Sequence, residues 1–145
     1  MRRNRWHRLL GLLTALTIGF GVVAAVPAPA SAEQTVCSGF TKEGSKGLTV
    51  PHSNGEVIRL WWYVNGSTHQ WCAYTELRGV YYNNGSKYYI GVELRNNATL
   101  IDHEENYFSR YAGPVHAYPY GSAFVTTVAI GTVRFGGVTY SVDSL

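Results

Sequence analysis

Between residues 56 and 135 the chain contains short runs in which apolar and polar positions alternate, and turn residues separate these runs. Four runs are rich in β-branched and aromatic residues: EVIRLWWYV (56–64), QWCAYTEL (70–77), KYYIGVELR (87–95) and AFVTTVAIGTVRF (123–135). Such runs are typical of strands, whereas residues 33–145 show no sustained helical period. The pattern predicts an all-β fold of six to eight strands, either an antiparallel β-sandwich or a small barrel.

Asn65-Gly66 separates the first two runs and favours a two-residue type I′ hairpin turn. That turn pairs Val64 with Ser67, Trp62 with His69, Leu60 with Trp71, and Ile58 with Ala73. One face of the hairpin is then apolar and consists of Ile58, Leu60, Trp62, Val64, Trp71 and Ala73. The other face carries Arg59, Trp61, Tyr63, Gln70, Cys72, Tyr74 and Glu76. Because both strands agree on the apolar side, we predict that the first face packs in the core.

Further turn signals divide the rest of the chain. Gly136-Gly137 predicts a second tight hairpin, with Phe135 opposite Val138 and Val133 opposite Tyr140. In residues 87–95 the inward positions are expected to be Tyr88, Ile90, Val92 and Leu94. Turns are also expected at Asn83-Asn84-Gly85 and at Asn96-Asn97. Three Asn-x-Ser/Thr triplets begin at residues 65, 84 and 97, and we interpret all three as turns rather than as glycosylation sites.

The stretch RYAGPVHAYPYG (110–121) combines three tyrosines with turn residues. Turns are predicted at Gly113-Pro114 and at Pro119-Tyr120-Gly121, because these residue combinations are typical of turns. Between them, VHAY (115–118) is long enough only for a short strand. Proline has no N–H to donate to a sheet, so we expect this strand to begin at a corner or to lie on a sheet edge. We interpret the stretch as a structural corner.

The first 32 residues have the features of a secretory signal peptide. A start with four arginines and no acid precedes an apolar run from Leu9 to Val26, then Pro27 and an Ala30-x-Ala32 cleavage site. We predict a signal helix with cleavage after Ala32, followed by one secreted domain, residues 33–145. The alternative is an uncleaved membrane anchor, because the apolar run has a length near the ~17–25 residues that span a bilayer.

Removal of the leader changes the charge of the protein. Four of the twelve Lys and Arg residues lie in the leader, so residues 33–145 keep eight against nine Asp and Glu, a net charge of −1. The basic character of the full chain therefore belongs mainly to the leader. We expect no nucleic-acid partner, and no membrane partner after cleavage.

Cys37 and Cys72 are the two cysteines of the chain, and both remain after cleavage. An exported protein folds in an oxidising compartment, so we predict a disulfide between them. Closing a loop of about 35 residues stabilises a fold by about 4 kcal/mol in the chain-entropy model. A metal pair would need a third ligand or a Cys-x-x-Cys spacing, and the sequence has neither.

Candidate catalytic groups are few. The densest polar cluster is DHEEN, Asp102 to Asn106, which suits acid–base or metal chemistry. We interpret it as a solvated turn between strands, and the isolated His52, His69 and His116 as structural or exposed. The sequence lacks a Gly-x-Ser-x-Gly elbow, a phosphate-binding glycine loop and a His-Glu-x-x-His motif. We therefore expect no enzyme, no metal and no cofactor, although a triad assembled across the fold is not visible in a sequence.

The second face of the first hairpin is the candidate binding surface. Its candidate residues are Arg59, Trp61, Tyr63, Gln70 and Tyr74, and their rings suit stacking on a sugar or on another protein. The alternative is that other parts of the chain cover these rings. We favour burial, because Cys72 lies on the same face and its bond to Cys37 draws residues 33–50 across it.

The chain resembles the spore-associated protein A group, small secreted proteins of filamentous, spore-forming actinobacteria. The resemblance rests on CSGF (37–40), WCAYTEL (71–77), ENYFSRYAGPVHAY (105–118) and VRFGGVTYS (133–141). Its most specific part is YAGPV, that is Tyr111, Ala112, Gly113, Pro114 and Val115. Members of the group often carry a further cysteine pair in the C-terminal half, which this chain lacks. The resemblance implies an exported, non-enzymatic protein of spores or aerial hyphae.

Three functional hypotheses follow. The first is a non-enzymatic protein of the spore or cell-envelope surface, with spore-surface proteins as partners. The second is a binding module for cell-wall polysaccharide. The third is a secreted protease inhibitor, for which the chain offers GLTVPHSNG (47–55) as a loop within the disulfide-closed segment.

Overall fold

The computed structural model describes residues 36–118 and 126–145. The predicted signal peptide, residues 1–32, lies outside the described residues, as does the turn predicted at residues 119–121. The described chain forms eight strands and one short 3-10 helix: β1 (Thr41–Thr49), β2 (Glu56–Val64), β3 (Trp71–Leu77), η1 (Gly79–Tyr81), β4 (Tyr88–Asn96), β5 (Thr99–Phe108), β6 (Tyr111–Ala117), β7 (Thr127–Phe135) and β8 (Val138–Asp143).

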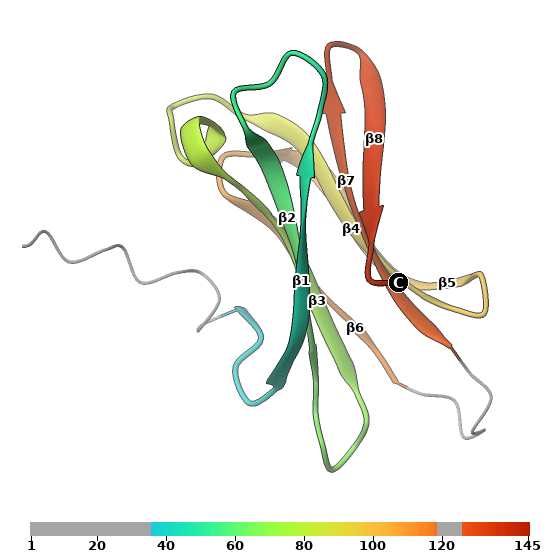
Figure 1. The fold of residues 1–145 in the computed structure, drawn as a ribbon. Coiled ribbons are helices and arrows are strands. Elements are labelled where there is room, and N and C mark those ends of the chain that lie inside the picture. The colour runs from blue at the N-terminus through green and yellow to red at the C-terminus, as the bar shows by residue number, and fades with distance from the viewer. Residues whose placement is uncertain (1–35, 119–125) are drawn as a thin grey trace, which may run out of the picture.

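The strands form two antiparallel four-stranded sheets that pack face to face (Figure 1). Sheet A has the order β1-β2-β3-β6, and sheet B has the order β5-β4-β7-β8. The all-β prediction is thus confirmed, and the architecture is the sandwich. Strands β1 and β8 meet on one flank of the sandwich, and β5 and β6 meet on the other.

The core lies between the sheets and is built from the predicted alternating positions. Its buried members include Ile58, Leu60, Ala73, Leu77, Ile90, Val92, Leu94, Ala129, Val133 and Val142. Trp62, Trp71 and Tyr88 pack against this core and are partly buried. The predicted inward faces of β2, β3 and β4 are therefore confirmed.

The β7–β8 hairpin has the predicted register, whereas the β2–β3 hairpin does not. Val64 pairs with Trp71 rather than with Ser67, so the loop spans residues 65–70. The Asn65 side chain accepts hydrogen bonds from the N–H groups of Ser67 and Thr68, at 2.9 and 3.1 Å, and this closes a longer turn. The observed register places residues 67–69 in solvent and pairs the apolar residues of both strands instead. The shift of four residues is even, so every side chain keeps its predicted face.

Two strands were not expected. Residues 41–49 form edge strand β1 instead of crossing the second face of the hairpin, and that face is covered by residues 36–40 and by Lys42, whose Nζ lies 4.1 Å from the centroid of the Trp61 ring. Residues 99–108 form edge strand β5, paired with β4, so the prediction of a solvated turn at Asp102–Asn106 is wrong. Both strands are polar because an edge strand faces water on several sides, and this polarity conceals them in the sequence.

The YAGPV stretch lies in β6, which is the edge strand expected from its proline. The predicted turn and corner at Gly113-Pro114 are wrong, because β6 already begins at Tyr111 and these two residues form a bulge within it. Ala73 pairs with Val115 but Thr75 pairs with Ala112, so Gly113 and Pro114 together stand opposite Tyr74 and β6 has one extra residue there. Gly113 has φ +103°, and a Cβ there would lie 3.0 Å from the Ala73 carbonyl oxygen. Glycine is therefore required by both conformation and space. The Gly113-Pro114 peptide bond is cis.

Candidate functional site

The aromatic side chains of the predicted binding face come together, but they are buried. Trp61, Tyr63 and Tyr74 are 6%, 4% and 0% exposed. The Tyr74 ring stacks on those of Trp61 and Tyr63, with centroids 6.3 and 6.1 Å apart. Cys37 closes this cluster through its disulfide to Cys72, and Val36, Phe40 and Tyr111 pack around it. The burial that we favoured from the sequence is confirmed, so these rings do not form an open platform.

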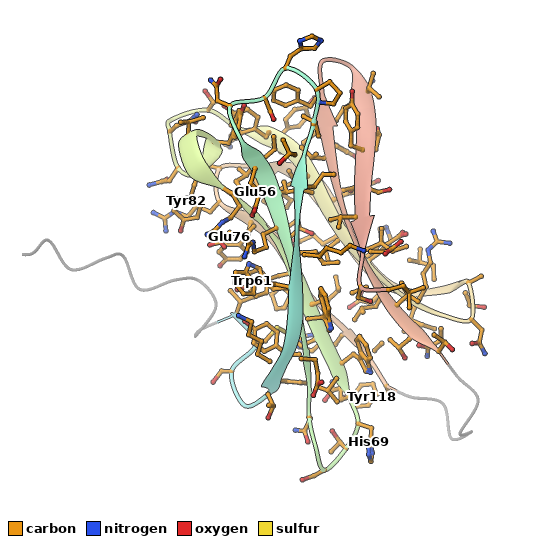
Figure 2. All side chains as sticks on the ribbon, viewed as in Figure 1. Glu56, Trp61, His69, Glu76, Tyr82 and Tyr118 are labelled. Atoms are coloured by element: carbon orange, nitrogen blue, oxygen red, sulfur yellow. A yellow bond between two sulfur atoms is a disulfide. The ribbon has the colours of Figure 1, made fainter. Side chains whose placement is uncertain are left out.

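The polar residues around this cluster form a structural ion network. Glu76 is 2% exposed, accepts a hydrogen bond from Trp61 Nε1 at 3.2 Å, and pairs with Arg78 Nη1 at 2.8 Å. Arg59 makes two hydrogen bonds to Glu56, at 2.8 and 2.6 Å, and this contact raises the pKa of the Arg59 guanidinium. Figure 2 shows Glu56, Glu76 and Trp61 along one side of sheet A. A buried charge needs such partners, and the buried Glu76 carboxylate has them in Trp61 and Arg78.

Gln70 lies away from this cluster. It sits in the loop after β2, where its carbonyl accepts the Asn65 N–H at 2.9 Å. The five predicted binding residues therefore divide into three buried rings, one paired arginine and one loop residue. Nothing in this arrangement is open to a ligand of sugar size.

Strand alternation divides the DHEEN cluster into two sets. Asp102 and Glu104 turn toward β6, where Asp102 Oδ2 accepts the His116 N–H at 2.8 Å and the Glu104 carboxylate accepts the Gly113 N–H. These two acids therefore close the flank between the sheets. The alternate residues, His103 and Glu105, lie on the outer face of sheet B.

The outer face of sheet B holds a shallow depression centred on Gly91. Across the strands, Gly91 is paired with Glu105 of β5 on one side and with Thr132 of β7 on the other. Along β4 the next outward residues are Tyr89 and Glu93. The row beside Tyr89 contains Tyr107 and Arg134, and the row beside Glu93 contains His103 and Ile130. A glycine at the centre of these side chains leaves a hollow lined by Gly91, Val92, Glu93, His103, Glu105 and Thr132.

Two tyrosines border this hollow. The rings of Tyr89 and Tyr107 meet edge to face with centroids 5.2 Å apart, and Tyr107 is 58% exposed. Desolvation raises the pKa of the Tyr89 phenol above its ordinary value of 10.0, and the charge and hydrogen bond of Glu105 raise it further. In this contact the Tyr89 hydroxyl is the donor and the Glu105 carboxylate is the acceptor. On the other side of the hollow, Glu93 is held by Arg95, with Nε at 2.8 Å and Nη2 at 3.2 Å.

The remaining sequence candidates occupy structural positions. The 47–55 segment contains the end of β1 and a compact turn, in which the Ser53 hydroxyl lies 2.8 Å from the Val50 carbonyl oxygen. His52 is exposed in this turn, and His69 lies at the tip of the β2–β3 hairpin (Figure 2). The His116 ring contacts Phe40, at 5.8 Å between centroids. Within residues 36–118 and 126–145, no group of three or more His, Cys, Asp or Glu side chains is arranged to hold a metal ion.

Comparison with family models, with curated proteins and with solved structures finds no match for this chain. In the described part of the chain, no helix is long and apolar enough to span a membrane. The Cys37–Cys72 disulfide, at 2.01 Å between sulfurs, is typical of a protein that folds in an oxidising, extracellular environment.

The sequence predicted part of the arrangement around the hollow at Gly91. The alternation in residues 87–95 already placed Tyr89, Gly91 and Glu93 on one outward face. What was missing was the neighbouring strand, because the polar residues of β5 did not predict one. Without β5, Tyr107, Glu105 and His103 had no position relative to β4.

Proposed function

We propose that this chain is an exported, non-enzymatic protein of the spore or cell-envelope surface, and that the outer face of sheet B binds a cell-wall polysaccharide. The observation that carries the binding proposal is the exposed Tyr107 ring, which meets the half-buried Tyr89 ring beside the hollow at Gly91. The surface location is supported by the leader sequence, by the disulfide and by the resemblance of the YAGPV region to spore-associated proteins.

The chemistry of this face suits a sugar. A pyranose ring presents C–H groups on its faces and hydroxyl groups on its rim, so it packs on an aromatic ring and hydrogen-bonds to polar groups around it. Tyr107 provides an exposed aromatic ring. Glu105, His103 and Thr132 surround the adjacent hollow with hydrogen-bonding groups. Since the face is a sheet surface rather than an enclosed pocket, it suits a long polymer that lies across the strands.

The two carboxylates beside the hollow, Glu93 and Glu105, are arranged for binding rather than for hydrolysis. A glycosidase needs one carboxyl group as a proton donor and another as a base or nucleophile, both facing the scissile bond. Glu93 is occupied by two hydrogen bonds from Arg95, and Glu105 accepts the Tyr89 phenol. Neither carboxylate is shielded from water. We therefore propose recognition without turnover.

Retention on insoluble polysaccharides tests the binding proposal. The mature domain is incubated with peptidoglycan, chitin and cellulose, and the bound fraction is measured for wild type, Tyr107→Ala and Tyr118→Ala. Tyr118 is the matched control, because it is also an exposed tyrosine, at 64%, but lies at the end of β6 in sheet A. We expect retention on at least one polymer, with at least a tenfold loss for Tyr107→Ala, since burying one large apolar side chain contributes roughly 1.5–3 kcal/mol, and little change for Tyr118→Ala. No retention on any of the three polymers, or an equal loss for both variants, would contradict the proposal.

The surface location has a separate test. Spores, hyphal walls and culture medium of a producing strain are fractionated, and the protein is quantified in each fraction with an antibody. We expect it in the spore or wall fraction, from which Tyr107→Ala should release it into the medium. A wild-type protein found only in the medium contradicts surface association.

A further inference from the structure

We infer that the hollow at Gly91 receives the ammonium group of an amino sugar, so that the face prefers polymers with free amines to N-acetylated or neutral ones. This inference rests on the proposed function and narrows its ligand. It comes from the kind of atom that lines the hollow, from the charges beside it and from its size.

The hollow admits only a small substituent. A Cβ built on Gly91 would lie 2.7 Å from Thr132 Oγ1, 2.9 Å from Glu105 Cβ and 3.3 Å from the Glu104 carbonyl oxygen. These short distances leave no room for an atom at the Cβ position itself, so a ligand group has to sit farther out in the hollow, between Thr132 and Glu105. An acetamido group has four heavy atoms, so part of it would extend beyond the side chains that line the hollow.

The atoms around the hollow are mostly hydrogen-bond acceptors. They include the carboxylates of Glu105 and Glu93, the Thr132 hydroxyl, which accepts as well as donates, and the Glu104 carbonyl. A group that fits such a rim must donate in several directions. A primary ammonium has three N–H donors and no acceptor, whereas a sugar hydroxyl has one donor.

The charges beside the hollow favour a cation. Two carboxylates line the hollow, those of Glu105 and Glu93, and Glu105 is an exposed side chain whose contact with the Tyr89 phenol brings no positive charge. Glu93 is balanced by Arg95, and His103 lies beside both acids. Arg134 lies diagonally from Gly91, in the row of Tyr89, and is therefore farther away than Glu105 and Thr132. Repulsion from Arg134 directs an ammonium toward Glu105.

The tyrosine rings add a second attraction for the same group. The face of an aromatic ring attracts an ammonium within about 6 Å of its centroid, and this attraction does not extend to a neutral acetamido group. Tyr89 and Tyr107 border the hollow on the side of Glu105. A glucosamine unit that stacks on Tyr107 thus meets both a carboxylate and a ring with its amine.

Calorimetric titration with three soluble oligosaccharides of equal length tests this inference: β-1,4-linked glucosamine, N-acetylglucosamine and glucose. At a mildly acidic pH, at which the amines of the glucosamine oligomer are protonated, we expect that oligomer to bind about tenfold more tightly than the other two, since hydrogen bonds to charged groups are about twice as strong as neutral ones. Glu105→Gln should remove this preference and leave the affinity for the N-acetylated oligomer within about twofold. Glu43→Gln is the matched control, because it makes the same charge change on β1 in sheet A and should preserve the preference.

The outcomes separate the two proposals. If none of the three oligomers binds, the proposed glycan function fails. If all three bind equally, or if Glu105→Gln leaves the preference intact, glycan binding stands and the ammonium inference is overturned. If Glu43→Gln removes the preference as fully as Glu105→Gln does, the attraction comes from the net charge of the domain, and the inference is again overturned.

Discussion

The outer faces of the two sheets carry similar residues and have opposite environments. Each has aromatic rings with glutamates and arginines beside them. On sheet A a disulfide-tied segment packs over the rings, and Trp61 is 6% exposed. On sheet B, Tyr107 is 58% exposed. The comparison shows that the composition of a sheet face does not distinguish a binding surface from a second core, because the segment that covers the face decides it.

The charged groups of the two faces differ in the same way. On sheet A, Glu76 is buried and both of its partners, Arg78 and Trp61, are fixed around it. On sheet B, Glu105 is exposed, and its partner is a neutral phenol. Buried charges must be satisfied within the fold, whereas an exposed carboxylate remains available to a ligand. Three experiments test this difference, and they follow in order of expected effect.

Removal of the disulfide should expose the outer face of sheet A, as the outer face of sheet B is exposed. In Cys37→Ala/Cys72→Ala the covering segment loses its covalent attachment, and we expect the free energy of unfolding to fall by about 4 kcal/mol. Denaturant unfolding measures this loss, and quenching of tryptophan fluorescence by iodide should increase as Trp61 is uncovered. Ser38→Ala is the control, since Ser38 is an exposed residue of the same segment. Unchanged quenching would show that residues 36–40 stay in place without the bond.

Neutralising one glutamate on each face should have unequal effects on stability. Glu76→Gln leaves Arg78 without its close ionic partner beside the aromatic cluster, and we expect a loss of about 2 kcal/mol, since hydrogen bonds to charged groups contribute about that much. Glu93→Gln breaks a half-exposed pair with Arg95 and should cost less than about 1 kcal/mol. Urea unfolding of both variants measures the difference. Equal losses would mean that the ion network on sheet A is as dispensable as a surface pair.

The smallest effect concerns the ionisation of Tyr89. Its phenol has a raised pKa, so the folded state favours the protonated form, and any stabilisation from this group is present below pH 10 and is lost as pH rises through the folded pKa. Glu105→Gln removes a charge that raises this pKa and should shift the titration to lower pH. The ultraviolet absorbance of tyrosinate, taken as the difference between each protein and its Tyr89→Phe variant, measures the shift. Glu43→Gln serves as the control, and an identical titration in all backgrounds would show that Glu105 does not act on the phenol.

Local patterns predicted much of the fold because local chemistry controls those parts. The Gly136-Gly137 turn fixed the register of the last hairpin, since two residues with positive φ leave a single tight connection. The strand faces were predictable even where the register was not. Asn65 supports both a two-residue turn and the observed loop, and pairing of Trp71 with Val64 selects the longer one. An even shift leaves each face unchanged, which explains why a wrong turn still gave the right core.

The candidate site was less predictable, because it depends on which strands are neighbours. Strand β5 has no apolar face of its own, and only its pairing with β4 places Tyr107 beside Tyr89 and Glu105 beside Gly91. The same pairing separates Asp102 and Glu104 from His103 and Glu105, although the four are consecutive in the chain. Consecutive residues of a strand point to opposite sides, so a cluster in sequence becomes two groups in space.

The sequence by itself determined the fold class, the inward side of each apolar strand and the pairing of the two cysteines. These follow from alternation and from the number of possible partners, which need no knowledge of distant segments. Tertiary structure alone decided which residues cover the outer face of sheet A and which strand lies next to β4. Both depend on contacts between segments far apart in the chain, and such contacts are selected by the free energy of the whole packed sandwich rather than by any local pattern.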